Sequence, residues 1–255
     1  MASQAAVDRD GNTMQALWAA AIAEHRRCWT DQPRCYGKPS FSDQDLRREL
    51  DPKLSRPPEA FQHMLAIYRV ARYFPKDNEE LKKDLWEKVR STVAAWEPET
   101  TLEDRAISLQ ECLPRRMGKD GKQPKLGDGP VSAASKLAWF FAPRHWTMYD
   151  SRASASLGAN SFVHHYRILQ RLGFIEWCNE ARPICRRFHP DLFPKRIWDK
   201  LLYLCTDWFE PGKRACRNID ESDRRLAREI CSARHSQPLE QYLLVRFPFP
   251  SRAGA

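Results

Sequence analysis

The sequence predicts an all-α protein, and three observations lead to this prediction. Apolar residues recur at helical spacing along most of the chain, alternating patterns typical of strands are scarce, and several segments open with residues that cap helices. The chain of 255 residues can bury a sizeable core as one large domain or as two lobes. We therefore expect a helical globule of roughly eight to ten helices.

The first half of the chain contains four predicted helices. Thr13 can cap "TMQALWAAAIAEHRRCW", and Pro58 suits the first turn of "RPPEAFQHMLAIYRVARYF". Asp77 begins "DNEELKKDLWEKVRSTVAAW", while Thr101 and Asp104 open "TLEDRAISLQECL" in an arrangement that resembles a capping box. One buried face of the second segment is predicted to consist of Phe61, Met64, Leu65, Tyr68 and Ala71.

A run rich in Gly and Lys, residues 117–130, is the predicted junction between two helical lobes of a single unit that spans residues 1–255. Beyond it, helical patterns cover "VSAASKLAWFF", "SFVHHYRILQRLGFIEWCNEA", "KRIWDKLLYLCTDWF" and "DESDRRLAREICSARH". The apolar tail "QYLLVRFPFP" is compatible with a short strand or with a packed extension. The second half is therefore also predicted to be helical.

The charge of the chain suggests a polyanionic partner. Lys and Arg number 42 against 33 Asp and Glu, which gives a net charge of +9 and an isoelectric point near 9.2. Basic residues are concentrated in the segments 115–128 and 182–200. Two solvated loops or the two sides of a polyanion-binding groove would both explain this pattern.

Cysteine usage and hydropathy predict a cytoplasmic protein that needs no metal and no other cofactor. The eight cysteines include no C-x-x-C pair, and the polar N-terminus lacks the apolar core of a signal peptide. The nearest metal-like spacing, formed by Cys178, Cys185 and His189, is interpreted as coincidence within apolar helices. No stretch has the apolar length that crosses a bilayer, so we expect no membrane partner.

The stretch "SKLAWFFAPRHWTMYDSRASASLG", residues 135–158, places a lysine and an aspartate on two successive predicted helices. On a helical wheel Lys136 lies opposite the apolar face of the first helix, which Pro143 ends. Asp150 suits the N-cap of the second helix, and Gly158 suits the residue after its C-terminus. Taken singly, the two charged residues are explained as a solvated lysine and a helix cap.

Together these two helices resemble the helix-hairpin-helix DNA glycosylase superfamily, particularly the 8-oxoguanine DNA glycosylases and endonuclease III. "GDGPVSAASKLAWFF" stands for the hairpin and the lysine helix, and "MYDSRASASLG" stands for the aspartate helix. The "SK…YDSR" arrangement is also similar to that of bacterial proteins with the 8-oxoguanine-glycosylase fold, including some that act in defence against phages with modified bases. The resemblance implies a two-lobed fold with a degenerate helix-hairpin-helix core.

The chain also departs from the family pattern. "LGDGPVSA" replaces the usual L-P-G-V-G hairpin, and the 14 residues from Lys136 to Asp150 form a shorter separation than is usual. The cysteines that hold an iron-sulfur cluster in endonuclease III relatives have no counterpart, because Phe188 and Pro194 stand at the required spacings from Cys185.

The resemblance implies roles for individual residues. Asp150 would stabilise positive charge on the deoxyribose, and Lys136 would attack C1′ to form a Schiff base, with possible AP-lyase activity, or would only bind phosphate while water attacks. The walls of the pocket for an extruded base would be Trp139, Trp146 and Tyr149. Contacts to DNA would come from Arg115, Arg116, Lys119, Lys122, Lys125, Arg144, His145 and Arg152.

The leading hypothesis is therefore a monomeric DNA glycosylase that flips a modified base out of double-stranded DNA and excises it, leaving an abasic site. A bulky modified cytosine of phage DNA is the substrate that the resemblance suggests. The alternative is a non-catalytic helical protein that binds DNA or RNA. A metal-dependent nuclease is disfavoured, because the sequence holds no compact acidic cluster for Mg²⁺.

Overall fold

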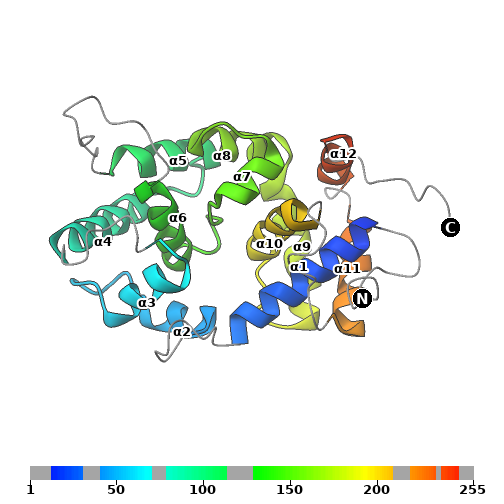
Figure 1. Ribbon diagram of the computed structural model, residues 1–255, viewed down its shortest axis with the longest axis horizontal. Coiled ribbons are helices and arrows are strands. Elements are labelled where there is room, and N and C mark those ends of the chain that lie inside the picture. Colours follow the sequence, from blue (N-terminus) through cyan, green and yellow to red (C-terminus); the bar gives the residue numbers. More distant parts are fainter. Residues whose placement is uncertain are drawn as a thin grey trace. The chain divides into compact units, whose positions relative to one another are not determined.

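The computed structural model describes residues 13–30, 41–70, 79–113, 129–208, 219–233 and 237–246, and these residues form twelve helices and no strand (Figure 1). The prediction of an all-α protein is confirmed. The helices are α1 (Thr13–Thr30), α2 (Asp43–Glu49), α3 (Glu59–Ile67), α4 (Glu79–Ala94), α5 (Leu102–Glu111), α6 (Gly129–Phe141), α7 (Ser151–Leu157), α8 (Phe162–Arg171), α9 (Phe174–Phe188), α10 (Pro194–Trp208), α11 (Glu221–Cys231) and α12 (Gln237–Arg246).

Two segments differ from what the sequence suggested. Residues 43–49, for which no helix was predicted, form the short helix α2. The start of the tail, considered above as a short strand, belongs to α12, which extends to Arg246. Both segments are short, so their apolar residues show no periodicity long enough to identify a helix.

The chain divides into two compact units. One unit comprises residues 26–151 and 161–166, and the other comprises residues 1–25, 152–160 and 167–255. The segment 117–130, predicted as a junction of lobes, lies almost entirely outside the described residues, so that assignment stays a prediction.

In the first unit, α6 is the helix around which the others pack. It contacts α2, α4 and α5, while α2 also packs on α3 and α4 on α5 (Figure 1). The interior of this unit holds Phe61 and Trp86, whose rings meet edge to face at 5.6 Å between centroids, and Phe141 contacts the same Trp86 ring at 5.0 Å. The aromatic residues at the C-terminal end of α6 therefore anchor it to α4.

The second unit is built on α9, which packs against both α10 and α11. Its core is a cluster of indole rings: Trp18 stacks on Trp177 at 4.9 Å, and Trp198 meets Trp177 edge to face at 5.1 Å. The Nε1 of Trp18 donates a hydrogen bond to Glu240 at 3.1 Å, which connects α1 with α12. Large aromatic side chains thus contribute to the buried apolar surface of this core.

Several helix ends follow the predicted capping chemistry. The Thr101 side chain accepts a hydrogen bond from the backbone N–H of Asp104 at 3.1 Å, which confirms the predicted start of α5. Gly158 follows α7 with φ of 66°, the left-handed conformation predicted for the residue after a helix C-terminus. Pro58 is the N-cap of α3, one position before the first turn in which it was expected.

None of the described helices combines the length and the apolar character that a membrane span requires.

Candidate active site

Helix α6 carries Lys136 and is covered by protein on nearly all sides. Ala133, Ala134 and Ser135 are fully buried, and Lys136 itself is 4% exposed. The helical wheel placed Lys136 on a polar face, where a lysine is usually solvated, and the expectation of solvent exposure is wrong. Small side chains let neighbouring helices approach α6 closely, so that its polar face is buried as well as its apolar face.

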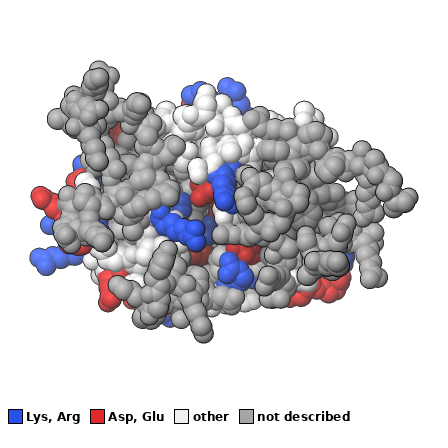
Figure 2. Space-filling model, viewed as in Figure 1, with Lys and Arg blue, Asp and Glu red and all other residues white. Residues whose placement is uncertain are grey.

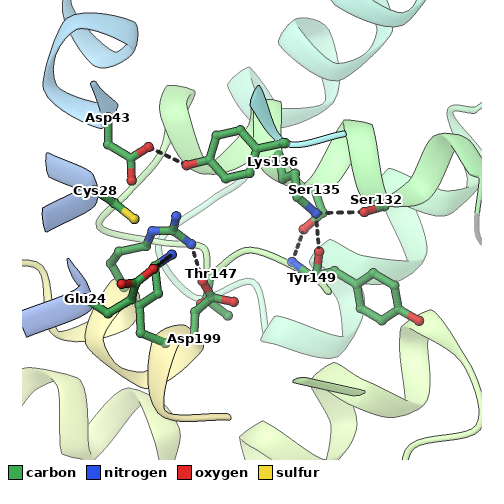
Figure 3. Close-up of polar contacts among 12 residues, drawn as sticks. Glu24, Cys28, Asp43, Ser132, Ser135, Lys136, Thr147, Tyr149 and Asp199 are labelled. Atoms are coloured by element: carbon green, nitrogen blue, oxygen red, sulfur yellow. Dashed lines mark hydrogen bonds and ion pairs between the residues drawn. The ribbon is translucent and has the colours of Figure 1, made fainter. Parts of the chain in front are cut away.

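Lys136 is bound within this interior by two short hydrogen bonds. Its Nζ donates to the Oγ of Ser132 and to the backbone carbonyl oxygen of Tyr149, each at 2.7 Å (Figure 3). The ring of Tyr68 lies 5.9 Å from the same nitrogen, at a distance that permits a cation–π interaction. Burial of an ammonium group costs free energy unless it is paired, and these three contacts offset that cost.

Ser135 is the centre of a second set of hydrogen bonds. Its Oγ accepts from the backbone N–H of Tyr149 at 2.7 Å and from the Nε1 of Trp146 at 3.2 Å. It also lies 2.8 Å from the hydroxyl of Tyr166, which donates its proton to the carbonyl of Thr147 at 2.9 Å. Since the Tyr166 proton is used there, the Ser135 hydroxyl is the donor between these two groups.

Ser135 and Lys136 together bind both backbone polar groups of Tyr149, the N–H and the carbonyl. The backbone N–H of Tyr149 donates to the Oγ of Ser135, and the backbone carbonyl of Tyr149 accepts from the Nζ of Lys136. We call this arrangement the Tyr149 clasp. It fixes the chain immediately before Asp150, which is half-buried and directly precedes α7. The two residues singled out in the sequence are therefore brought together through the backbone of Tyr149.

The aromatic residues proposed as a base pocket lie in the protein interior. Trp139 and Trp146 have no exposed surface and Tyr149 is 4% exposed. Trp146 stacks on Tyr166 at 4.1 Å, while Tyr149 meets His165 edge to face at 5.3 Å. In this conformation these rings pack against protein, so an extruded base could reach them only after a rearrangement, and the pocket assignment stays a prediction.

Three of the residues predicted to contact DNA are exposed. Arg144 and His145 follow α6, and Arg152 lies in α7, where its guanidinium is 5.2 Å from the ring of Tyr203. Both signs of charge occur on the described part of the face drawn in Figure 2. The other five residues of this prediction lie outside the described residues: Arg115, Arg116, Lys119, Lys122 and Lys125.

The second basic segment contributes less surface charge than its composition suggests. Lys195 and Arg196 are buried, and Arg196 donates a hydrogen bond to the buried carboxylate of Asp199. Arg186 and Arg187 of the same segment are exposed. The side chains of Lys195 and Arg196 therefore lie in the protein interior and are not available to a polyanion.

Sequence reasoning missed a buried arginine that supports the turn after α6. Arg105 donates from Nη1 to the carbonyl of His145 at 2.8 Å and from Nη2 to the carbonyl of Glu97 at 2.9 Å. Burial lowers the pKa of the Arg105 guanidinium below its ordinary value. Nothing in the surrounding sequence marks Arg105, because its partners are backbone carbonyls, which any residue type can supply.

Tyr68 lies near Lys136, and neither Tyr68 nor its partner Asp43 was predicted as a site residue. The hydroxyl of Tyr68 donates to Oδ1 of the buried Asp43 at 2.5 Å. The edge-to-face contact between Tyr68 and Phe140, at 6.1 Å, fixes the ring further. The only signal in the sequence was the helical spacing of Tyr68, which predicted burial and not a polar contact.

The described residues include no cluster of three or more His, Cys, Asp or Glu side chains suited to a metal ion. Cys178 and Cys185 are buried in α9, and burial raises the pKa of each thiol to about 12. These two cysteines therefore behave as apolar core residues.

Comparisons of the chain with protein-family models, with curated proteins and with solved structures find no match.

The Tyr149 clasp predicts unequal effects of two serine substitutions. Ser135→Ala removes the described acceptor of the buried Tyr149 N–H, whereas the Nε1 of Trp146 keeps the backbone carbonyl of Ser135 at 3.0 Å, and we expect the free energy of unfolding to fall by about 1–3 kcal/mol. Ser132→Ala is the matched control, because the half-buried Ser132 hydroxyl makes a single described contact with Lys136. Urea denaturation of both variants tests the prediction, and equal losses would contradict the central position of Ser135.

A second prediction concerns the pH dependence of stability. Burial lowers the pKa of His165 from 6.5 to about 3, and burial together with Arg196 and Lys200 holds the pKa of His25 well below its ordinary value. At pH values between these lowered pKa values and 6.5, the two histidines bind protons in the unfolded chain but not in the folded chain. Each histidine therefore destabilises the fold by about 1.4 kcal/mol per pH unit as the pH falls below 6.5.

Urea denaturation at pH 7, 6 and 5 measures this slope. The variant His165→Phe cannot bind the proton, so its stability should fall less steeply with decreasing pH than that of the wild-type protein. An unchanged slope in this variant would contradict the buried, uncharged state of His165.

Proposed function

We propose that the protein is a DNA glycosylase that excises a modified base and leaves an abasic site, with Asp150 as the catalytic carboxylate. One observation carries this proposal: Lys136 donates a hydrogen bond to the carbonyl of Tyr149, the residue before Asp150. Lys136 is thus linked to the residue before Asp150, and the order of these two residues first suggested a glycosylase. The all-helical fold and the net charge of +9 are compatible with this function.

The contacts of Lys136 favour a positioning role over a nucleophilic one. Its nitrogen donates two hydrogen bonds at 2.7 Å and is 4% exposed, so it is neither directed at solvent nor accessible to a sugar. To attack C1′ it would have to leave both acceptors, one of which is a backbone carbonyl. We therefore propose a monofunctional reaction in which Lys136 holds the chain at Tyr149 while water is the nucleophile.

The reaction breaks the bond between C1′ and the base nitrogen, whose electron pair leaves with the base. Positive charge develops on the deoxyribose, and a carboxylate at Asp150 stabilises it electrostatically. Water then adds its oxygen to C1′ and its released proton neutralises the departing base. The products are the free base and an abasic site, and no oxidant or cofactor is needed.

The substrate is proposed to be double-stranded DNA with a bulky modified cytosine, as in phage DNA, and the protein to act as a cytoplasmic monomer in defence. The substrate and the defence role rest on the family resemblance alone. A base must leave the helical stack before a carboxylate can reach its C1′, and contacts from Arg144, His145 and Arg152 would offset part of that cost.

A non-catalytic nucleic-acid-binding protein is the second candidate, and the burial of Trp139 and Trp146 favours it. A protein of this kind binds DNA or RNA in a salt-dependent manner but releases no base from any substrate.

Substitution of Asp150 tests the proposed catalysis. Genomic DNA from phages with different modified bases is incubated with the protein, and released bases are identified by mass spectrometry. We expect Asp150→Asn to slow base release by about 100-fold or more, because the amide keeps the size of the side chain but lacks its charge. DNA affinity serves as the control and should be unchanged, whereas undiminished base release would overturn the assignment of Asp150.

The role of Lys136 is tested by borohydride, which reduces a Schiff base to a stable covalent adduct. With Lys136 as a positioning residue, the wild-type protein should release the base without any adduct to DNA. A trapped adduct that disappears in Lys136→Gln would show instead that Lys136 is the nucleophile.

A further inference from the structure

The guanidinium of Arg105 joins two connections of the first unit. Its Nη1 donates to the carbonyl of His145 at 2.8 Å, and its Nη2 donates to the carbonyls of Glu97 and Pro98 at 2.9 and 3.3 Å. His145 lies in the turn after α6, whereas Glu97 and Pro98 lie in the loop between α4 and α5. One buried side chain therefore sets the spacing between this turn and this loop.

The ring of Trp96 extends the same junction. It lies 5.7 Å from the Cζ of Arg105, and its Nε1 donates to the hydroxyl of Ser108 at 3.1 Å. The Ser108 hydroxyl in turn donates to the carbonyl of Arg105 at 2.9 Å. The Trp96 ring also lies 5.1 Å from the ring of Trp146, the residue after His145. Ring packing and hydrogen bonds thus join the loop to the turn.

The described partners of this buried cation are three carbonyl oxygens and a ring, and none of these is a carboxylate. Arg105 is 4% exposed, and burial of a charge is costly unless its hydrogen bonds are made. A guanidinium suits this place because its planar fork of donors reaches several acceptors at fixed angles, which a single ammonium nitrogen does not. The geometry of the junction therefore favours an arginine over a lysine.

The turn that Arg105 holds presents Arg144 to solvent. The N–H groups of His145 and Trp146 both bind the carbonyl of Ala142, at 2.9 and 3.0 Å, and Trp146 is buried. The backbone on either side of the exposed arginine is thus fixed by hydrogen bonds, one of which comes from Arg105. A fixed guanidinium binds a phosphate with less loss of conformational entropy than a mobile one.

The loop on the other side of the junction is acidic at its surface, because Glu97 and Glu99 are both exposed. Their carboxylates repel a phosphate, whereas the guanidinium of Arg144 attracts it. The net attraction for a phosphate at the turn therefore depends on the spacing between the turn and the loop, which Arg105 sets.

We propose that Arg105 is a positioning residue for DNA binding, which holds the turn so that Arg144 reaches a backbone phosphate apart from the acidic loop. The proposal rests on the proposed function for its choice of DNA and of Arg144 as a contact. Arg105 itself touches no phosphate, since it is buried, and it acts through the carbonyl of His145.

The test is a double-mutant cycle between Arg105 and Arg144, read as the affinity of the full-length protein for a labelled duplex with an abasic-site analogue. Arg144→Ala should weaken binding about 5-fold and reduce the slope of affinity against salt by about one phosphate contact. Arg105→Lys should also weaken binding about 5-fold, because an ammonium does not bridge both connections. The double variant should be about 5-fold weaker than the wild-type protein, and not about 25-fold weaker.

Three results would overturn the proposal. Independent effects that multiply in the double variant would show that Arg105 does not act through the turn. Full affinity in Arg105→Lys would show that the charge suffices without the geometry. Unchanged affinity in Arg144→Ala would leave Arg105 with no contact to position.

Arg47→Lys is the matched control for a general loss of stability. Arg47 also donates to a backbone carbonyl, that of Phe140 at 2.9 Å, but this carbonyl belongs to α6 and not to the turn. Affinities are compared at a temperature at which each variant is folded, as judged from its melting curve. The effects of Arg47→Lys and Arg144→Ala should multiply, and coupling as strong as that with Arg105 would contradict a specific role of Arg105.

A second variant leaves the interior untouched and therefore tests the spacing even where Arg105→Lys does not fold. The double substitution Glu97→Gln and Glu99→Gln changes two exposed side chains of the loop. It should strengthen DNA binding about 3-fold, because the repulsion between the loop and the phosphate is removed. Unchanged affinity would overturn the role assigned to the spacing between loop and turn.

Failure of this proposal is distinguishable from failure of the proposed function. A protein that releases no base but shows coupling between Arg105 and Arg144 would keep the positioning role and lose the glycosylase activity. A protein that releases a base, with independent effects of Arg105→Lys and Arg144→Ala, would keep the activity and lose the positioning role.

Discussion

The Tyr149 clasp is the constraint on which the candidate site depends. Two consecutive residues of α6, Ser135 and Lys136, bind the N–H and the carbonyl of Tyr149 at 2.7 Å each. A hydroxyl and an ammonium group inside a protein are costly unless they are hydrogen-bonded, so this segment is stable only in the position that satisfies both groups. The backbone that leads into Asp150 is thereby held against α6.

The surroundings reinforce this constraint from several helices. Tyr166 from α8 extends the hydrogen bonds of Ser135 to the carbonyl of Thr147, and Arg105 from α5 binds the carbonyl of His145. The segment between α6 and α7 has no regular secondary structure of its own, so its carbonyls need partners from side chains. A buried arginine and a buried tyrosine supply two of them, which explains why these polar residues occupy the core.

The sequence was informative wherever structure depends on near neighbours. Helical spacing predicted most helices, Thr101 predicted the start of α5, and Gly158 predicted the left-handed residue after α7. It failed where packing decides: a wheel of α6 placed Lys136 on a polar face, whereas α2, α4 and α5 pack around that helix. Periodicity describes the side chains of one helix and carries no information on what covers them.

The candidate site also combines features that the local sequence reveals with features that only packing determines. The linear motif identified Lys136 and Asp150, but their connection through Tyr149 depends on the fold. Asp43 and Tyr68 are 25 residues apart in sequence, and their contact leaves no local signal. Aromatic residues within the motif suited both a pocket and a core, and only the structure shows that Trp139 and Trp146 have no exposed surface.

The role of Asp150 is tested most directly by a crystal structure of the protein bound to duplex DNA that contains an abasic-site analogue. We expect a carboxylate oxygen of Asp150 to lie within about 4 Å of C1′, as charge stabilisation requires, while Lys136 still donates to the carbonyl of Tyr149. A complex in which Asp150 is remote from the sugar, or in which Lys136 has left Tyr149 to contact C1′, would contradict this expectation.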